Sequence, residues 1–369
     1  MAPAALSILN ITFQDNPTER AKAFGAYGAV SGAGGAIGVL AGGLLTEYAS
    51  WRWCLLVNVP LALVTAAAAS RVVHESRATG STRYDVPGAL LATLGLVSLV
   101  YGFTKASSDG WASGPTVTFL SIAVVLLVTF VVVETRTSHP LLPLRVVTER
   151  NRGGAFLASF LMGAGLFAMF VFLSYYMQTV LHYSPLKAGV AFLPFAAGLI
   201  AAASASTAIV PRIGARIPMA SGIFIGAIGL GWLSQIGVHS SFWVSVLGPQ
   251  LLMSIGLGLA FPALSNTALT NVAAADSGVA SAMVNTTQQV GGSLGTALLN
   301  TVAATATASY IRANGPASAS AGFVHGYSVA FAVGAGLLVA AALVSAIFVT
   351  DRGTTVPALQ LEPALAPNA

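Results

Sequence analysis

The sequence contains few charged residues and a single cysteine. Lysine, arginine, aspartate and glutamate make up 7% of its 369 residues, whereas hydrophobic residues make up 56%, and the mean hydropathy is +0.81. So small a polar fraction cannot cover the surface of a water-soluble globule. Cys54 alone cannot form an internal disulfide, and no group of cysteines and histidines has the spacing of a metal site. We therefore expect a protein embedded in the lipid bilayer, with no metal and no cofactor.

The basic residues are scattered along the chain. The 16 lysines and arginines give a net charge of +5, but they lie in short polar stretches and form no basic amphipathic face. This distribution argues against nucleic acid as a partner. In a membrane protein it indicates instead which loops stay on the cytoplasmic side.

Long apolar stretches fill most of the sequence. In hydrocarbon every backbone amide must be satisfied internally, so only helices or a closed barrel can span, and continuous runs such as Val117–Val133 lack the alternation of barrel strands. We expect an all-α polytopic membrane protein with about ten complete transmembrane helices and, at Met1–Phe13, an N-terminal partial helix. The predicted spans are Ala23–Leu45, Trp53–Ser70, Val86–Phe103, Val117–Val133, Ala155–Met177, Ala188–Val210, Ile217–Ile236, Phe242–Ser265, Val279–Ala304 and Gly326–Val349.

The loops of this ten-span arrangement alternate in basic charge. One side receives 12 of the 16 basic residues and the other receives 4, which makes the first side cytoplasmic. The cytoplasmic set is Arg20, Lys22, Arg71, Arg77, Arg83, Arg136, Arg145, Arg150, Arg152, Arg212, Arg216 and Arg352, and the outer set is Arg52, Lys105, Lys187 and Arg312. The connection Glu134–Arg152 is the longest charged cytoplasmic loop and is a candidate hinge between halves.

Glycines recur along the first predicted span. They lie at Gly25, Gly34, Gly38, Gly42 and Gly43. Positions about four residues apart share one face of a helix, so this stripe lets another helix approach backbone to backbone. Tight static packing and a surface that slides during a conformational cycle both remain open.

Further short motifs accompany the glycine stripe in a particular order. They are Trp51-Arg52-Trp53, Asn58-Val59-Pro60, Tyr176-Met177-Gln178, Tyr183-Ser184-Pro185, Leu193-Pro194, Arg212-Ile213-Gly214-Ala215-Arg216 and Asn285–Gly295. With the stripe, they resemble the fourteen-helix drug:proton antiporter branch of the major facilitator superfamily, over about Met1–Val349. The family's stripe has a proline after its third glycine, where this chain has Val39, which puts any kink at that point in doubt.

The resemblance implies a helical-bundle fold and a division of the chain. Residues 1–71 would be the remainder of the N-terminal transporter half, 72–151 two extra linker-region helices with cytoplasmic connections, 152–350 the C-terminal six-helix half, and 351–369 a disordered cytoplasmic tail. About three and a half helices of the family pattern would precede Met1, so the resemblance implies N-terminal truncation. One of those helices carries a carboxylate that contributes to proton coupling in the family.

Polar side chains within the spans are the candidate site residues. Asn285, Gln288 and Gln289 share one face of a predicted helix, where they would line a substrate path or bond to other helices. Tyr175 and Gln178, at an outer helix end, would form a gate or, for the tyrosine, anchor the chain at the lipid interface.

Other polar and helix-breaking residues lie near the ends of the spans. Arg212, Gly214 and Arg216 would form a cytoplasmic basic loop. The acidic residues at predicted helix ends, Glu47, Asp85 and Glu134, are expected to be solvated or to pair with neighbouring arginines, and Asp109 and Asp276 are expected to lie in loops. Pro194 and Pro262 predict kinks.

The predicted function is transmembrane transport. We expect a multi-pass protein of the bacterial inner (plasma) membrane that exports small amphipathic compounds such as drugs, antibiotics or metabolites by alternating access, with lipid, the substrate and protons as partners. An inactive truncated fragment of such an exporter is the first alternative. A membrane-embedded lipid enzyme is the second, but no nucleophile, base or metal constellation supports catalysis.

Overall fold

The computed structural model describes residues 37–72, 85–137, 140–270, 272–273 and 276–350, together with Ile8, Thr12, Phe13, Ala23 and Gly34. The predictions for Gly25, for most of the partial helix Met1–Phe13 and for the tail 351–369 lie outside these residues. Within them the secondary structure consists of helices joined by loops, with no strand, which confirms the predicted all-α polytopic fold.

The helices follow one another with short connections. A helix covers Ile37–Tyr48. The helices after it are α3 Trp51–Leu56, α4 Asn58–Val72, α5 Val86–Asp109, α6 Gly114–Arg136, α7 Leu144–Thr148, α8 Arg150–Tyr175, α9 Pro185–Ala191, α10 Leu193–Ile213, α11 Arg216–Leu233, α12 Leu247–Leu269, α13 Ser277–Asn314 and α14 Ala319–Phe348. Two π-helical segments, Tyr176–Val180 and Phe242–Val246, continue α8 and precede α12.

Eight stretches of the described residues are long and apolar enough to cross a membrane. They correspond to eight of the ten predicted spans. The predicted span Val279–Ala304 lies within α13, a helix of 38 residues that carries more polar side chains than these eight. At 1.5 Å per residue α13 is about 57 Å long, which exceeds the hydrocarbon thickness of about 30 Å. Of the predicted span Ala23–Leu45, only Ala23, Gly34 and the part from Ile37 onward are described.

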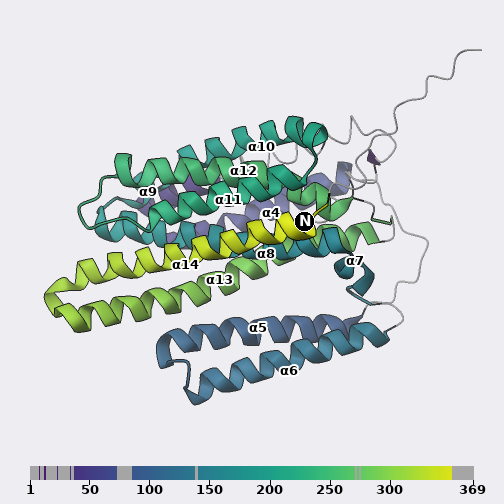
Figure 1. The fold of residues 1–369 in the computed structure, drawn as a ribbon, viewed down its shortest axis with the longest axis horizontal. Helices are drawn as coiled ribbons and strands as arrows, with labels where there is room; N and C mark the ends of the chain where they lie inside the picture. The colour runs from purple at the N-terminus through teal and green to yellow at the C-terminus, as the bar shows by residue number, and fades with distance from the viewer. Residues whose placement is uncertain are drawn as a thin grey trace, which may run out of the picture.

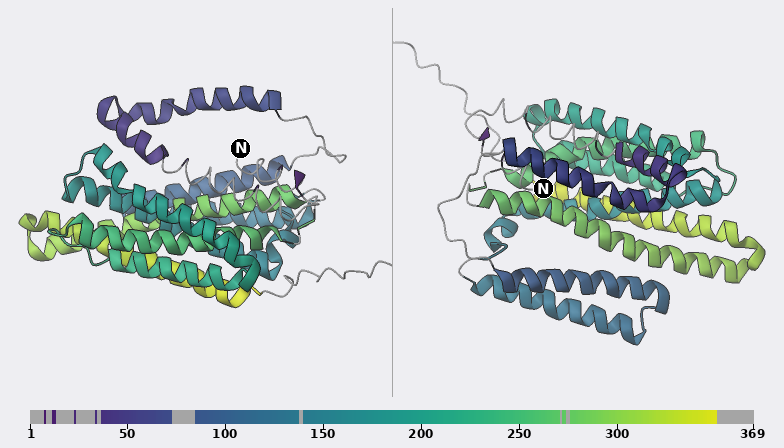
Figure 2. Two further views of the ribbon diagram at one scale, coloured as in Figure 1. Left: turned by 90° about the horizontal axis from the view of Figure 1, so that it is seen from above. Right: turned by 180° about the vertical axis from the view of Figure 1, so that it is seen from behind.

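Six long helices pack into one bundle, with a hairpin beside it. The bundle consists of α8, α10, α11, α12, α13 and α14, and the hairpin of α5 and α6 touches it through α13 (Figure 1). Figure 2 shows α3 and α4 standing apart from the bundle, and neither buries a residue.

Small residues let the hairpin helices approach closely. A Cβ added at Gly95 would lie 2.8 Å from Leu127 Cδ2, and one added at Gly102 would lie 2.7 Å from Leu120 Cδ2. The turn between the helices contains Gly110, whose φ of 88° favours glycine.

The outer faces of the helices are apolar. Val124, Val125 and Val128 on α6 are 59%, 63% and 58% exposed, and Leu63 and Val64 on α4 are 66% and 68% exposed. Uninterrupted apolar surface of this kind is stable against lipid tails and not against water. The chain is therefore a multi-pass membrane protein.

One of the two predicted prolines coincides with a break. The predicted span Ala188–Val210 is divided at Phe192, where α9 ends and α10 begins with Leu193 and Pro194. Proline fits the first turn of a helix because no intrahelical hydrogen bond is lost there. Pro262, by contrast, lies inside α12, which continues through it.

Candidate functional site

The closest helix contact in the bundle joins α8 to α13. A Cβ added at Gly291 would overlap the backbone carbonyl of Phe160, and one at Gly295 would lie 2.5 Å from Ala164 Cα. From the other side, a Cβ at Gly163 would overlap the backbone carbonyl oxygen of Gln288 and lie 3.1 Å from its Cα. Gly291, Gly292 and Gly295 therefore pack closely against α8.

The polar candidates on α13 lie at the depth of this contact. Gln288 is 11 positions after the start of α13, so it lies about 17 Å from the N-terminal end of the helix. Asn285 bonds back to Ser281 O at 3.3 Å. Within the described residues the side-chain amides of Gln288 and Gln289 have no hydrogen-bond partner; Gln288 is partly buried and Gln289 is exposed. These amides are free to bind a ligand near the middle of the membrane.

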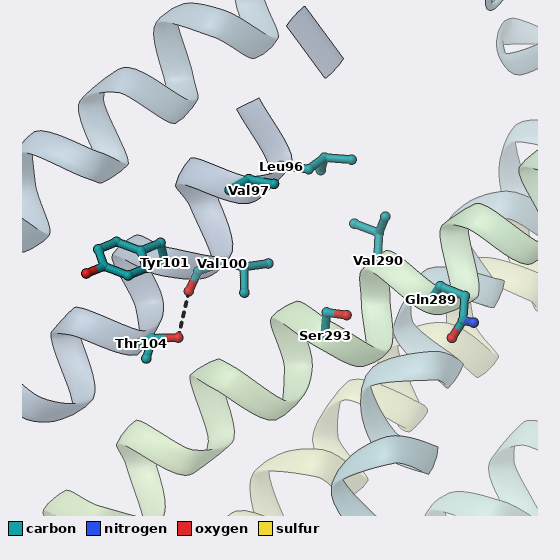
Figure 3. A pocket seen from close by; sticks show the side chains of 8 residues that line it. All are labelled: Leu96, Val97, Val100, Tyr101, Thr104, Gln289, Val290 and Ser293. Carbon is teal, nitrogen blue, oxygen red and sulfur yellow. Dashed lines mark hydrogen bonds between the residues drawn. The ribbon is translucent and has the colours of Figure 1, made fainter. Parts of the chain in front are cut away.

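A mostly apolar, open groove of about 400 Å³ lies between α13 and α5 of the hairpin. Its lining from α5 is Leu96, Val97, Val100, Tyr101 and Thr104, and its lining from α13 is Gln289, Val290 and Ser293 (Figure 3). The Thr104 hydroxyl is occupied by its own helix, donating to Val100 O at 2.9 Å. The polar groups that α13 brings to this space are the Gln289 amide and the Ser293 hydroxyl.

Tyr175 and Gln178 lie at the opposite, outer end of α8. Tyr175 is 52% exposed, and Gln178 donates to Ser174 Oγ at 2.9 Å. Twelve residues separate Tyr175 from Gly163, which corresponds to about 18 Å along the helix. The structure therefore does not bring these two residues together with Asn285, Gln288 and Gln289.

The neighbouring Tyr176 closes the outer end of the bundle. Its side chain is fully buried, and its hydroxyl donates to Gly237 O at 2.8 Å, in the loop after α11. Tyr176 begins the π-helical segment, a geometry that is frequent at functional sites.

The glycine stripe meets α9 at its outer end. A Cβ at Gly43 would lie 2.9 Å from Pro185 O, and one at Gly189 would lie 3.0 Å from Val39 O, whereas Gly34, Gly38 and Gly42 have nothing within 4 Å. Beside this contact, Glu47 Oε2 accepts from Leu186 N at 2.9 Å and so caps α9. Among the described glycines of the stripe, close packing is thus confined to Gly43.

The predicted basic loop caps the C-terminal end of α14. Gly214 ends α10 with a φ of 83°, a conformation that favours glycine. After this turn comes Arg216, whose Nε and Nη2 donate to Ala346 O in the last turn of α14 at 2.9 and 2.6 Å. Cations at a helix C-terminus satisfy its free carbonyls and oppose its dipole. Arg212 lies in the last turn of α10, where its charge has the same favourable position.

A second basic residue ties the linker to α13. Arg145 on α7 forms two hydrogen bonds of 2.9 Å with the carboxylate of Asp276, which directly precedes α13. These bonds hold the pKa of Asp276 below its ordinary value, although burial of the carboxylate opposes the shift. The same contact raises the pKa of Arg145.

The acidic residues near the helix ends differ in whether they pair with a basic residue. Asp276 pairs with Arg145, and Asp109 pairs with Lys105 at 3.4 Å. Asp85 and Glu134 are neither solvated nor paired with arginine: they are 9% and 4% exposed and lie next to each other. The expectation was wrong for these two because the hairpin brings the start of α5 beside the end of α6, where the backbone amides of Gly88 and Leu142 bond to the carboxyls.

One buried glutamine was not predicted from the sequence. Gln250 on α12 is fully buried, and within the described chain neither its amide nitrogen nor its amide oxygen has a hydrogen-bond partner. The available signal was an amide in an apolar run, in the sequence Gly248-Pro249-Gln250-Leu251.

The sequence also matches known proteins. A family model described as Major Facilitator Superfamily matches residues 1–296. The chain is 44% identical to the puromycin resistance protein pur8 of Streptomyces alboniger, over 95% of this chain and 71% of that protein. It is 38% identical to the cephamycin export protein CmcT of Amycolatopsis lactamdurans, over 83% of this chain and 64% of that protein.

A third relative is more distant. The tetracenomycin C resistance and export protein of Streptomyces glaucescens is 30% identical, over 82% of this chain and 56% of that protein. The chain thus spans less than two thirds of the length of the last two relatives.

Proposed function

The chain belongs to the Major Facilitator Superfamily, and on that premise we propose that it exports small amphipathic compounds across the bacterial plasma membrane by alternating access. The observation that carries the proposal is the pair of unoccupied amides, Gln288 and Gln289, at mid-depth on a helix that packs through glycine against α8. The names of the relatives, which refer to puromycin, cephamycin and tetracenomycin C, favour antibiotics as the substrate class.

The division into halves suggests how the substrate site opens. Residues 1–71 and 152–350 would rock against each other, with the hairpin within 72–151 as an added element. The contact of Gly43 and Glu47 with α9 links these two parts and would close the outer side. The resemblance to the drug:proton antiporters implies that influx of protons drives export. It implies no catalytic activity.

Transport into inverted membrane vesicles tests the proposal. We expect puromycin or ethidium to accumulate when the vesicle interior is acidified, and a protonophore to abolish the accumulation. Gln288→Leu and Gln289→Leu each remove about 0.5–1.5 kcal/mol of hydrogen bonding, which raises the KM by about 2- to 12-fold. Ser221→Ala is the control, because this exposed hydroxyl donates back to Ile217 O of its own helix at 2.6 Å.

Two results would contradict the proposal. The assignment as an exporter fails if vesicles with correctly inserted protein accumulate neither compound under any gradient. The assignment of the path fails if both glutamine variants transport with the KM of the Ser221→Ala control.

A further inference from the structure

Two buried carboxyl groups meet at the cytoplasmic end of the hairpin. Asp85 caps α5, and its Oδ1 accepts from Gly88 N at 2.8 Å. Glu134 lies in the last turn of α6, and its Oε2 accepts from Leu142 N at 3.1 Å. One oxygen of each carboxyl therefore accepts a hydrogen bond from a backbone amide. Asp85 and Glu134 expose only 9% and 4% of their surface.

The other oxygen of each carboxyl has no donor. Asp85 Oδ2 and Glu134 Oε1 are buried without a hydrogen-bond partner in the described part of the chain. Both crowd the position that a side chain at Gly88 would occupy, with Glu134 Oε1 3.0 Å from it, so the two carboxyls face each other across this glycine.

No cation neutralises the pair within the described residues. Arg136, at the end of α6, is exposed and makes no ion pair there, and Arg145 on α7 is engaged with Asp276. Two negative charges this close, and largely removed from water, repel strongly, so they cannot both stay ionised without a compensating positive charge. A single proton removes one charge and turns that carboxyl into the missing donor for the other.

We propose that Asp85 and Glu134 form a proton-binding site that holds one proton between their facing oxygens. A metal cation fits less well, since Na⁺ or Mg²⁺ takes about six oxygen ligands and the pair offers two free ones. The space also overlaps the position of a single added Cβ at Gly88, which leaves little room for an ion.

The bound proton fastens three segments to one another. They are the start of α5, the end of α6 and the connection at Leu142, which leads to α7 and its bond from Arg145 to Asp276. Loss of the proton at alkaline pH adds a second negative charge, separates the carboxyls and loosens this end of the hairpin. The site stands on the hairpin's own contacts and does not depend on the proposed export function.

Infrared difference spectroscopy on the full chain in lipid nanodiscs tests the site. We expect the carbonyl stretch of a protonated carboxyl to disappear as the pH rises, and the midpoint of thermal unfolding to fall over the same range. Asp85→Asn and Glu134→Gln remove the band and the pH dependence of the midpoint, because the amide donates in place of the proton. Asp109→Asn, at the other end of α5, leaves both unchanged.

Three outcomes would overturn the proposal. The first is absence of the band from the wild type at every pH at which it stays folded. The second is persistence of the band in both Asp85→Asn and Glu134→Gln. The third is recovery of the alkaline midpoint on adding Na⁺ or Mg²⁺, which would make this a cation site. Gly88→Ala keeps both carboxyls but fills the space between them, and it should also abolish the band.

Discussion

The glycine contact between α8 and α13 yields a quantitative prediction. In Gly291→Ala the new Cβ would overlap Phe160 O and lie 2.6 Å from Phe160 C and 2.8 Å from Phe160 Cα. Ordinary contact distances begin near 3.4 Å, so the helices must separate by roughly 1 Å or bend. Neighbours that are backbone atoms cannot move aside as a flexible side chain would.

The energetic cost follows from two opposing effects. Overpacking a well-packed contact costs about 1–3 kcal/mol, whereas replacing glycine by alanine in a helix gains up to about 1 kcal/mol. Gly336→Ala on α14 is the matched control. Its Cβ would have nothing within 4 Å, so this variant gains helix stability from alanine without any cost of overpacking. The difference between the two variants therefore isolates the packing cost at about 1–3 kcal/mol, or about 5- to 150-fold in the folding equilibrium.

Reversible unfolding in mixed micelles measures this difference. The fraction folded is followed by tryptophan fluorescence while the proportion of denaturing detergent is raised, and the midpoints of the two variants are compared with that of the wild type. Gly291→Ala should unfold at a lower proportion of denaturing detergent than Gly336→Ala. Equal midpoints for the two variants would show that α8 and α13 are not in backbone contact at this position.

Two further predictions concern the two ends of the bundle. Asp276→Asn removes the carboxylate whose pKa Arg145 depresses. A depressed pKa stabilises the fold at pH values above the ordinary pKa of about 4, and this stabilisation is lost as the pH falls. The wild type should therefore lose stability on acidification, and the variant should lose less. Unfolding midpoints across the acid range check this, and an identical acid profile in both proteins would contradict it. Tyr176→Phe removes the hydrogen bond to Gly237 O, a carbonyl oxygen that also accepts from Ser240 N at 3.3 Å. We expect the free energy of unfolding to fall by about 0.5–1.5 kcal/mol in the same micelle assay. An unchanged free energy of unfolding would rule out the bond.

Much of the fold could be read from local properties of the sequence. The eight spans, the break before Pro194 and the helix-ending Gly214 follow from hydropathy and backbone chemistry, which act within a few residues. The order of short motifs was sufficient to indicate the family. Gly291 and Gly295 could likewise be recognised as contact points from their spacing alone.

What the sequence could not supply is which surfaces meet. That α8 is the partner of Gly291, and that Tyr175 lies far from Gln288, depends on the packing of helices distant in sequence. Asp85 and Glu134 are 49 positions apart and resemble ordinary solvated helix ends in the sequence. Only the turn of the hairpin buries them together, because burial and the identity of the neighbouring charge are tertiary properties that no local pattern encodes.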